Sequence, residues 1–417
     1  MSRWGFFRQA AWIIATTIGG GLFGMLSMKV VSAQLRTGSG EFAAFTALQQ
    51  GLILCTIPFT GLQTAFAYLA ARAEDPAGRA ALSGAMRGLC RLLIIAWLVA
   101  WCGVLVFQGR ILAGLKLPPP ALWLALLAAL PSVLTPALFG VLQGRQDFRW
   151  LGIAGIVNNA ALFCGMGVAV TWMAPTATGA VAGFCAGWWA AFAFALHRTR
   201  SHWQVPPARF DFMRFFGTFI PLSLGMGLPT FMLRWDYLTV NRFFEASQGT
   251  DGYTAARVVG GAVAYLTTAL TWVLFPKIVQ SVARSEKTPA LMQALGAAAL
   301  VGAGAALGCM VLPELPLRIL APKYVSFSRL VPMCVWAIIP LSLSTILINN
   351  LMARERYGVV RWILVLAGGY WATLRLYHPS FEAVIGVMGG FCTLLLATSV
   401  LCTWVAGRRP AAVDLPS

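Results

Sequence analysis

The sequence predicts an all-α polytopic membrane protein. Between Ala10 and Ala406, about a dozen apolar stretches alternate with short loops that hold most of the charge. A helix of roughly 20 apolar residues crosses the ~30 Å hydrocarbon core of a bilayer. Only 11% of the 417 residues are charged and 59% are hydrophobic. A soluble protein carries charge on about a quarter of its residues, so the solvent around this chain is mostly lipid.

Each apolar stretch of the N-terminal half is bounded by charged or turn-forming residues. We expect spans at residues 10–33 (between Arg8 and Arg36), 42–71 (Glu41 and Arg72), 90–114 (Arg87 and Lys116), 121–142 (Lys116 and Arg145), 150–173 (Arg149 and Pro175) and 178–197 (Pro175 and Arg198). Residues 1–33 have the outline of a signal peptide. Their apolar run is too long for a signal-peptide core, so we expect an uncleaved first span.

The C-terminal half divides in the same way. We expect spans at residues 215–241 (between Arg214 and Arg242), 252–278 (Asp251 and Arg284), 290–312 (Lys287 and Glu314), 329–352 (Lys323 and Arg354), 358–376 (Arg356 and His378) and 381–406 (His378 and Arg408). The total is about 12 transmembrane helices.

The distribution of Lys and Arg sets the expected orientation. With the N-terminus inside, the inner segments hold 20 of the 31 basic residues, the outer segments hold 8 and the spans hold 3. The positive-inside rule therefore places both termini on the cytoplasmic side of the cytoplasmic (inner) membrane. Arg79, Arg200 and Arg408 are expected inside, and Lys116 and Lys323 outside.

Composition and missing motifs exclude several classes of function. The net charge of +18 is spread over every inner loop, as membrane topology and anionic lipid require, so we expect no nucleic-acid partner. The nine cysteines lie in apolar spans without CxxC spacing, and the three histidines form no metal-binding motif. There is no P-loop, and the acids of the short outer loops form no obvious pair. We expect no cofactor, no metal and no enzymatic activity.

Short segments of the two halves are similar at a nearly constant offset, which predicts an internal repeat. The loop Leu142–Phe148 matches Leu351–Tyr357 at an offset of 209, and Phe42 matches Tyr253 at an offset of 211. Because each half has an even number of spans, the repeat is parallel, with a substrate cavity expected between the halves near the midplane. We expect an N-terminal six-helix lobe (1–197), a cytoplasmic linker (198–214) and a C-terminal six-helix lobe (215–417).

Several segments, in order, resemble the polysaccharide transporter (Wzx-type) family of the MOP (MATE-like) exporter superfamily. They are Gly40-Glu41-Phe42-Ala43-Ala44-Phe45 leading to Phe59-Thr60-Gly61-Leu62-Gln63, the loop Leu142–Phe148, the stretch Asp236–Tyr253, Leu274-Phe275-Pro276, and Leu317-Arg318-Ile319-Leu320 followed by Tyr324. The resemblance covers nearly the whole chain. Lipid II flippases of the superfamily usually carry two further helices, which are absent here. Multidrug exporters of the MATE type share the twelve-helix plan and are the nearest rival.

Ionisable residues inside a span are costly unless they face protein or water, so Lys29, Arg234, Asp236 and Arg257 are the candidate substrate-binding residues. Lys29, Arg234 and Arg257, together with Arg110 and Arg375, are expected in one layer of the outer third. They either snorkel to lipid headgroups or converge between the lobes, where clustered cations would bind a diphosphate. Asp236 cannot face Arg234 at i,i+2 on one helix, so its expected partner lies on a neighbouring span, with Arg257 the candidate.

Glycine and proline mark the helices that bend most easily. Gly20 and Gly24 lie in the first span, and Pro221 and Pro229 lie in the seventh, which is its repeat counterpart. These are the candidate gating helices. Tight packing through small residues is the alternative reading.

The expected function is a flippase that moves a lipid-diphosphate-linked oligosaccharide, an anionic glycan, across the membrane by alternating access. The alternative is a cation-coupled multidrug exporter, which needs an embedded carboxylate, whereas a diphosphate carrier needs net positive charge. One embedded acid against three embedded bases favours the flippase. A structural or assembly protein without a transport cycle is a third class. The resemblance allows association with polysaccharide-assembly enzymes.

Overall fold

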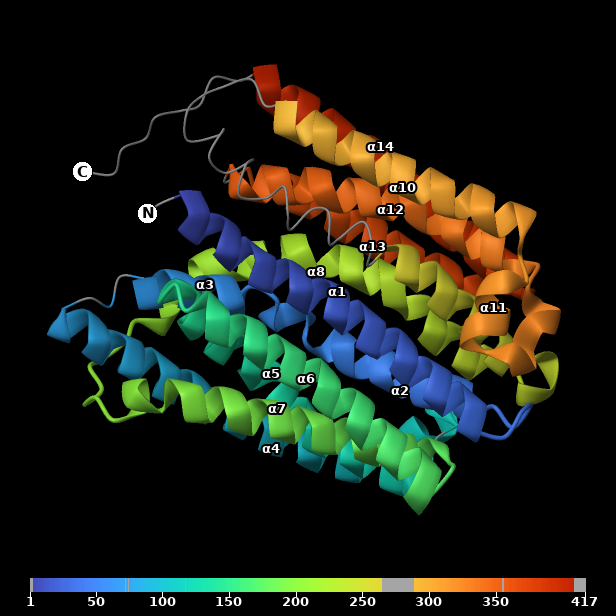
Figure 1. Cartoon of the computed structure of the whole chain (residues 1–417), viewed down its shortest axis with the longest axis horizontal. Coiled ribbons are helices and arrows are strands. Elements are labelled where there is room, and N and C mark those ends of the chain that lie inside the picture. Colours follow the sequence, from blue (N-terminus) through green and yellow to red (C-terminus); the bar gives the residue numbers. More distant parts are fainter. Residues whose placement is uncertain are drawn as a thin grey trace.

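The described part of the chain is a bundle of long helices, with no strand among its residues (Figure 1). It is a computed structural model, and we describe residues 3–71, 73, 75–116, 118–264, 289–354 and 356–408. Within these ranges, 10 helices are long and apolar enough to cross a membrane. The all-α membrane fold predicted from the sequence is confirmed.

The helices of the first half overlap the predicted spans. They are α1 (Arg3–Gln34), α2 (Glu41–Cys55), a 3₁₀ turn (Ile57–Phe59), α3 (Leu62–Ala71), α4 (Pro76–Leu115), α5 (Pro119–Gly144), α6 (Phe148–Val168) with a π-helical turn (Ala169–Met173), and α7 (Ala177–Trp203). Helix α4 begins well before the predicted span, because the Asp75 side chain accepts a hydrogen bond from the Gly78 N–H (2.9 Å) and caps the helix.

The second half has a similar order. It contains α8 (Phe212–Phe243), a 3₁₀ turn (Ala246–Gln248), a helix described over residues 250–264, α10 (Pro289–Val311), α11 (Leu315–Leu320), a 3₁₀ segment (Pro322–Phe327), α12 (Leu330–Ala353), α13 (Val359–Leu376) and α14 (Phe381–Arg408). The rest of the predicted span 252–278, with Leu274-Phe275-Pro276, lies outside the described residues, as do the basic residues Arg72, Lys277, Arg284, Lys287 and Arg409.

The second predicted span, 42–71, was expected as one helix, and this is wrong. Helix α2 ends at Cys55, and α3 begins at Leu62. Pro58 has no backbone N–H, and its ring would clash with the carbonyl four residues earlier in a continuous helix. The Thr56 and Thr60 hydroxyls donate to the carbonyls of Ile53 (2.7 Å) and Ile57 (2.9 Å), and so satisfy acceptors at the break.

Helix packing has the same pattern in both halves. In the first half α1 packs on α6, and α7 packs on α5 and α6; in the second half α8 packs on α13, and α14 packs on α12 and α13. Figure 1 shows α1–α7 and α8–α14 as two groups, consistent with two lobes. Where α6 meets α7, a Cβ on Gly183 would collide with the backbone of Gly165, so glycine permits this close approach.

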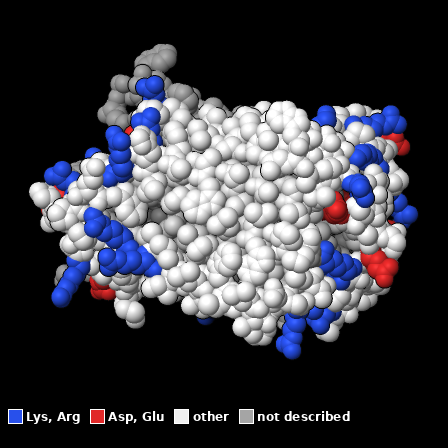
Figure 2. All heavy atoms as spheres, turned by 90° about the horizontal axis from the view of Figure 1, so that it is seen from below, with Lys and Arg blue, Asp and Glu red and all other residues white. Residues whose placement is uncertain are grey.

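Charge is concentrated at the two ends of the molecule. Figure 2 shows a broad band without charged residues between two ends that carry Lys and Arg, as expected where lipid tails surround the middle. Helix α1 begins, and α14 ends, at the same end of the bundle (Figure 1). Following the charge-based expectation, we call this the inner end, and we call the end where α1 ends and α2 begins the outer end.

Candidate functional site

The embedded acid Asp236 is paired, and its partner is the one expected from the sequence. The Arg257 Nε lies 2.6 Å from the Asp236 Oδ2, and both side chains are 0% exposed. The Tyr253 hydroxyl donates to the same carboxylate at 2.7 Å. A buried carboxylate needs such donors, because desolvation of an unpaired charge is very costly.

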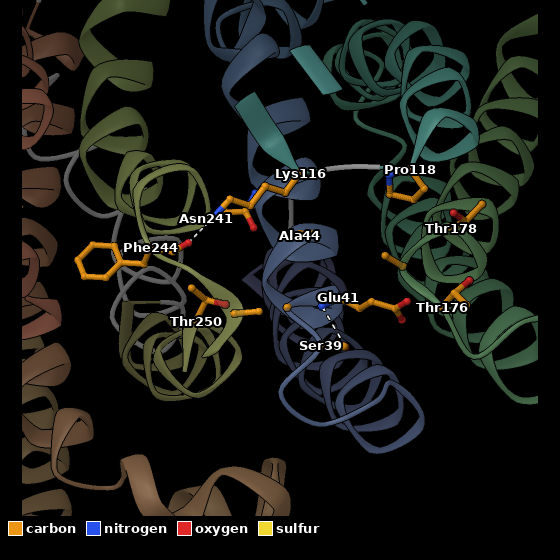
Figure 3. A pocket seen from close by; sticks show the side chains of 13 residues that line it. Ser39, Glu41, Ala44, Lys116, Pro118, Thr176, Thr178, Asn241, Phe244 and Thr250 are labelled. Carbon is orange, nitrogen blue, oxygen red and sulfur yellow. Dashed lines mark hydrogen bonds between the residues drawn. The ribbon is translucent and has the colours of Figure 1, made fainter. Parts of the chain in front are cut away.

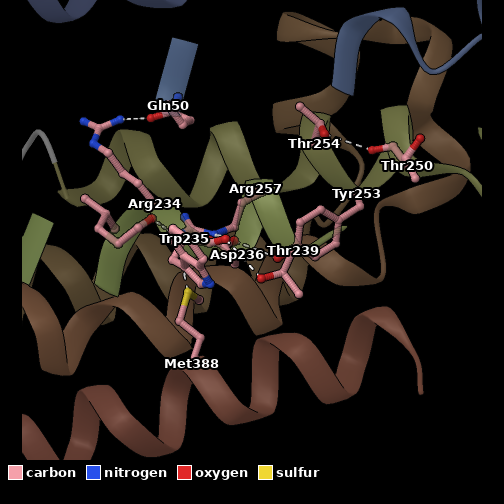
Figure 4. Close-up of polar contacts among 11 residues, drawn as sticks. Gln50, Arg234, Trp235, Asp236, Thr239, Thr250, Tyr253, Thr254, Arg257 and Met388 are labelled. Carbon is pink, nitrogen blue, oxygen red and sulfur yellow. Dashed lines mark hydrogen bonds and ion pairs between the residues drawn. The ribbon is translucent and has the colours of Figure 1, made fainter. Parts of the chain in front are cut away.

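This pair lies in the core of the second lobe (Figure 4). The Arg257 Nη2 also donates to the Leu233 carbonyl (2.5 Å) and contacts the Met388 Sδ (3.3 Å). The network therefore joins α8, the helix over residues 250–264 and α14. The charges of Asp236 and Arg257 therefore compensate each other inside one lobe.

The Arg234 side chain points away from this ion pair, toward α2 of the first lobe. Two residues along a helix correspond to a rotation of about 200°, so Arg234 and Asp236 lie on opposite sides of α8. The Arg234 guanidinium donates to the side-chain oxygen of Gln50 on α2 (Figure 4). Arg234 is half-buried, and Gln50 is buried. Arg234 therefore lies at the boundary between the lobes, roughly 14 Å from the outer end of α8 at 1.5 Å per residue.

Lys29 does not join Arg234. It is exposed on the face of α1 that also exposes Leu22 (58%) and Leu26 (44%), seven and three residues before it. Arg110 and Arg375 are exposed as well. The five cations share the outer part of the molecule along its long axis, but the structure does not bring them together in one cluster.

The candidate gating helices α1 and α8 are both continuous. On α1, a Cβ on Gly20 would lie 2.8 Å from the Asn159 side chain of α6, whereas one on Gly24 would meet no atom within 4 Å. The contact at Gly20 is with the flexible end of a side chain, so the choice between bending and tight packing for these glycines stays a prediction. Pro221 and Pro229 both lie inside α8.

Residues at the break between α2 and α3 hold the inner half of α8. The Thr60 hydroxyl donates to the Ser223 carbonyl (3.0 Å), and the Gly61 N–H donates to the Ser223 hydroxyl (3.1 Å). A Cβ on Gly227 would collide with Ile57. Helix α8 therefore contacts the first lobe at two levels, through Ser223 and Gly227 in its inner half and through Arg234 further out.

At the outer end, the described residues enclose a pocket of about 240 Å³ (Figure 3). Its lining comes from both lobes and includes Glu41, Lys116, Thr176, Asn241 and Thr250. The cavity expected from the sequence was at the midplane. This pocket instead lies where α2, α5 and α7 begin and α8 ends, and its residues were not among the sequence candidates.

Asp251 lies beside this pocket and binds the start of α2. Its carboxylate accepts hydrogen bonds from the N–H groups of Gly40 (3.0 Å) and Ala43 (2.9 Å). Burial raises the pKa of the Asp251 carboxyl, and the backbone donors of α2 act in the opposite direction. An anion at a helix N-terminus is favoured by the helix dipole and by the N–H groups that lack partners there.

Comparison with known proteins identifies the fold. A structure described as the inward-facing conformation of a multidrug resistance MATE family transporter of the MOP superfamily matches with a TM-score of 0.62 and 13% identity, over 95% of this chain and 98% of that one. The corresponding outward-facing structure matches with a TM-score of 0.57 and 13% identity, over 94% and 95%. The eukaryotic MATE transporter AtDTX14 matches with a TM-score of 0.64 and 12% identity, over 96% and 95%.

No family model and no curated protein sequence matches the chain. At 12–13% identity the likeness to these structures concerns the fold. The chain therefore has the fold of MATE transporters of the MOP superfamily, and its membership of the polysaccharide transporter branch stays a prediction.

Proposed function

We propose that this chain is a transporter that moves a lipid-diphosphate-linked oligosaccharide across the membrane by alternating access of its two lobes. The observation that carries the proposal is the position of Arg234, whose guanidinium reaches from α8 to Gln50 of α2 at the boundary between the lobes. Guanidinium groups bind phosphate oxygens through charge-assisted hydrogen bonds.

The second candidate is a cation-coupled multidrug exporter. It is favoured by the fold, since the similar structures carry the names of multidrug transporters. Coupling requires an embedded carboxylate that can exchange H⁺ or Na⁺. Asp236 is the only acid well inside a predicted span, and Arg257 and Tyr253 occupy its oxygens. This arrangement supports the glycan substrate over cation exchange at Asp236.

The test is replacement of Arg234. A charge-assisted hydrogen bond is worth about 1.5–3 kcal/mol, and each 1.36 kcal/mol is a factor of ten, so Arg234→Gln should reduce transport about tenfold or more. Arg234→Lys keeps the charge without the bidentate geometry, so partial activity is expected. The readout is flipping of a fluorescent lipid-diphosphate oligosaccharide in proteoliposomes, with protein abundance measured in parallel.

The matched control is Lys29→Gln, which removes an exposed cation from α1, the counterpart of α8, and should leave the rate of flipping per molecule of inserted protein at the wild-type value. Full flipping by Arg234→Gln at normal abundance would remove Arg234 from the site. Export of a cationic dye by the wild-type protein, without glycan flipping, would replace the proposal by the multidrug alternative.

A further inference from the structure

Two exposed lysines cross the lobe boundary at the outer end, in opposite directions. Lys323 of the second lobe donates from its Nζ to the carbonyls of Ala33 (2.5 Å) and Leu35 (3.0 Å), where α1 ends. Lys116 of the first lobe, between α4 and α5, donates to the carbonyl of Phe244 (2.5 Å), just after α8 ends (Figure 3). Each lysine therefore holds the end of the other lobe's first helix.

The two contacts are related by the internal repeat. Lys116 and Lys323 are 207 residues apart, and Phe244 follows Leu35 by 209 residues and Ala33 by 211. The repeat itself has an offset of 209–211. The chemistry matches as well, because the last carbonyls of a helix lack partners within it and carry partial negative charge, which an ammonium group satisfies.

The hydrogen bond between Asp251 and Gly40 locates the pseudo-twofold axis that relates these two contacts. The Asp251 carboxylate binds the N–H of Gly40, and the two residues are 211 apart, which is one repeat length. Residues related by a twofold axis touch their own counterparts only near that axis. Lys116 and Lys323 thus lie on either side of a pseudo-twofold axis, and a separation of the lobes at the outer end would stretch both contacts.

We propose that Lys116 and Lys323 form a symmetric pair of latches that keeps the outer end closed, and that both must release for this end to open. The proposal rests on the alternating access proposed above. Stacking of Phe42 on Tyr324 (6.1 Å between ring centroids) closes the same end between the latches and the core.

The hydrogen bonds made by the two lysines are weak enough to break when the outer end opens. Both lysines are exposed, and water competes with an exposed hydrogen bond, so each contact is weak enough to break during a transport cycle. Lys116 also has an alternative acceptor in its own lobe. Glu41 lines the same pocket, and its Oε2 has no hydrogen-bond partner among the described residues. Release from Phe244 therefore does not leave the ammonium group without an anion nearby.

The test measures the distance between the lobes in the full-length protein without substrate. Spin labels on cysteines replacing Trp172 and Leu376, which are 82% and 84% exposed at the outer end of each lobe, report opening by pulsed electron spin resonance in nanodiscs. Lys116→Met and Lys323→Met should each raise the ratio of open to closed molecules about fivefold, and the double variant about 25-fold. Lys→Arg variants keep a donor and should remain closed.

Arg318→Met is the matched control. Arg318 is an exposed cation seven residues after the end of α10, but its partner Glu314 belongs to the same lobe (2.6 Å). A double Lys→Met variant whose distances match those of the wild type and of this control would overturn the proposal, as would an effect of one lysine alone. Because the labels need no substrate, failure of the latch would leave the Arg234 flipping test standing, and failure of glycan flipping would leave the latch standing.

Discussion

Replacing one member of the Asp236–Arg257 pair should destabilise the protein far more than replacing both. Both side chains are 0% exposed, so Asp236→Asn leaves the Arg257 charge buried without its partner. Breaking a buried ion pair in this way costs about 3–5 kcal/mol, and replacing both members by apolar residues of similar volume is often neutral. Asp236→Leu and Arg257→Met should each lower the free energy of unfolding by about 4 kcal/mol, as should Asp236→Asn, and the double variant Asp236→Leu/Arg257→Met should lower it by about 1 kcal/mol or less.

The coupling energy from such a double-mutant cycle is then several kcal/mol, well above the error of measurement. The assay is unfolding of the purified protein by SDS in mixed micelles, followed by tryptophan fluorescence. Arg318 and Glu314 provide the matched control, because their atoms are also 2.6 Å apart but the side chains are 68% and 50% exposed. An exposed helical pair at i,i+4 contributes only about 0.3–0.5 kcal/mol.

The result that would refute this reasoning is an Asp236→Asn variant with the unfolding free energy of the wild type and no transport. Asp236 would then act in the transport cycle, as a coupled exporter requires, and not in the core of the second lobe.

Three further outcomes are expected. Lys29→Gln should lower membrane integration or abundance more than transport, because an exposed cation beside exposed leucines anchors the helix at the headgroups; a loss of specific transport at normal abundance would contradict this. Gly183→Ala should lower the thermal unfolding midpoint because its Cβ would collide with α6, whereas Gly386→Ala, with no atom within 4 Å of the new Cβ, should not; equal midpoints would contradict the packing. A cysteine at Arg200 in a cysteine-free variant should resist an impermeant thiol reagent in intact cells, and one at Trp172 should react; labelling at Arg200 would reverse the topology.

The sequence predicted those features that the membrane dictates. Lipid allows backbone to cross it as a helix with all hydrogen bonds satisfied internally, so apolar length alone located most spans. The pairing of Asp236 with Arg257 followed from two physical limits. A buried acid needs a cation, and residues two apart on a helix cannot face each other.

The sequence did not predict the features that depend on which side of a helix faces the core, or on contacts with backbone carbonyls. Lys29 and Arg234 occupy similar positions in the two repeats, but only the packed structure shows that one is exposed and the other faces Gln50. The lysines of the latches donate to main-chain carbonyls, and any residue carries a carbonyl, so no pattern in the sequence identifies the acceptor. A proline such as Pro58 is compatible with a kink and with a break, and the break is seen only in the structure, where α2 ends at Cys55 and α3 begins at Leu62.

The polar contacts of α8 divide the helix into two parts. Its inner part is held by the first lobe, through Thr60 and Ser223, and its outer part is joined to the second lobe through Asp236 and Arg257. Pro229 lies between these two sets of contacts. Its ring removes the hydrogen bond to the carbonyl four residues earlier, which is where helices bend. A bend at Pro229 would let the outer parts of the lobes separate while both of these sets of contacts persist, once Arg234 has released Gln50 and Lys116 has released Phe244. Of the four gating candidates, Pro229 is therefore the one that the arrangement of α8 favours.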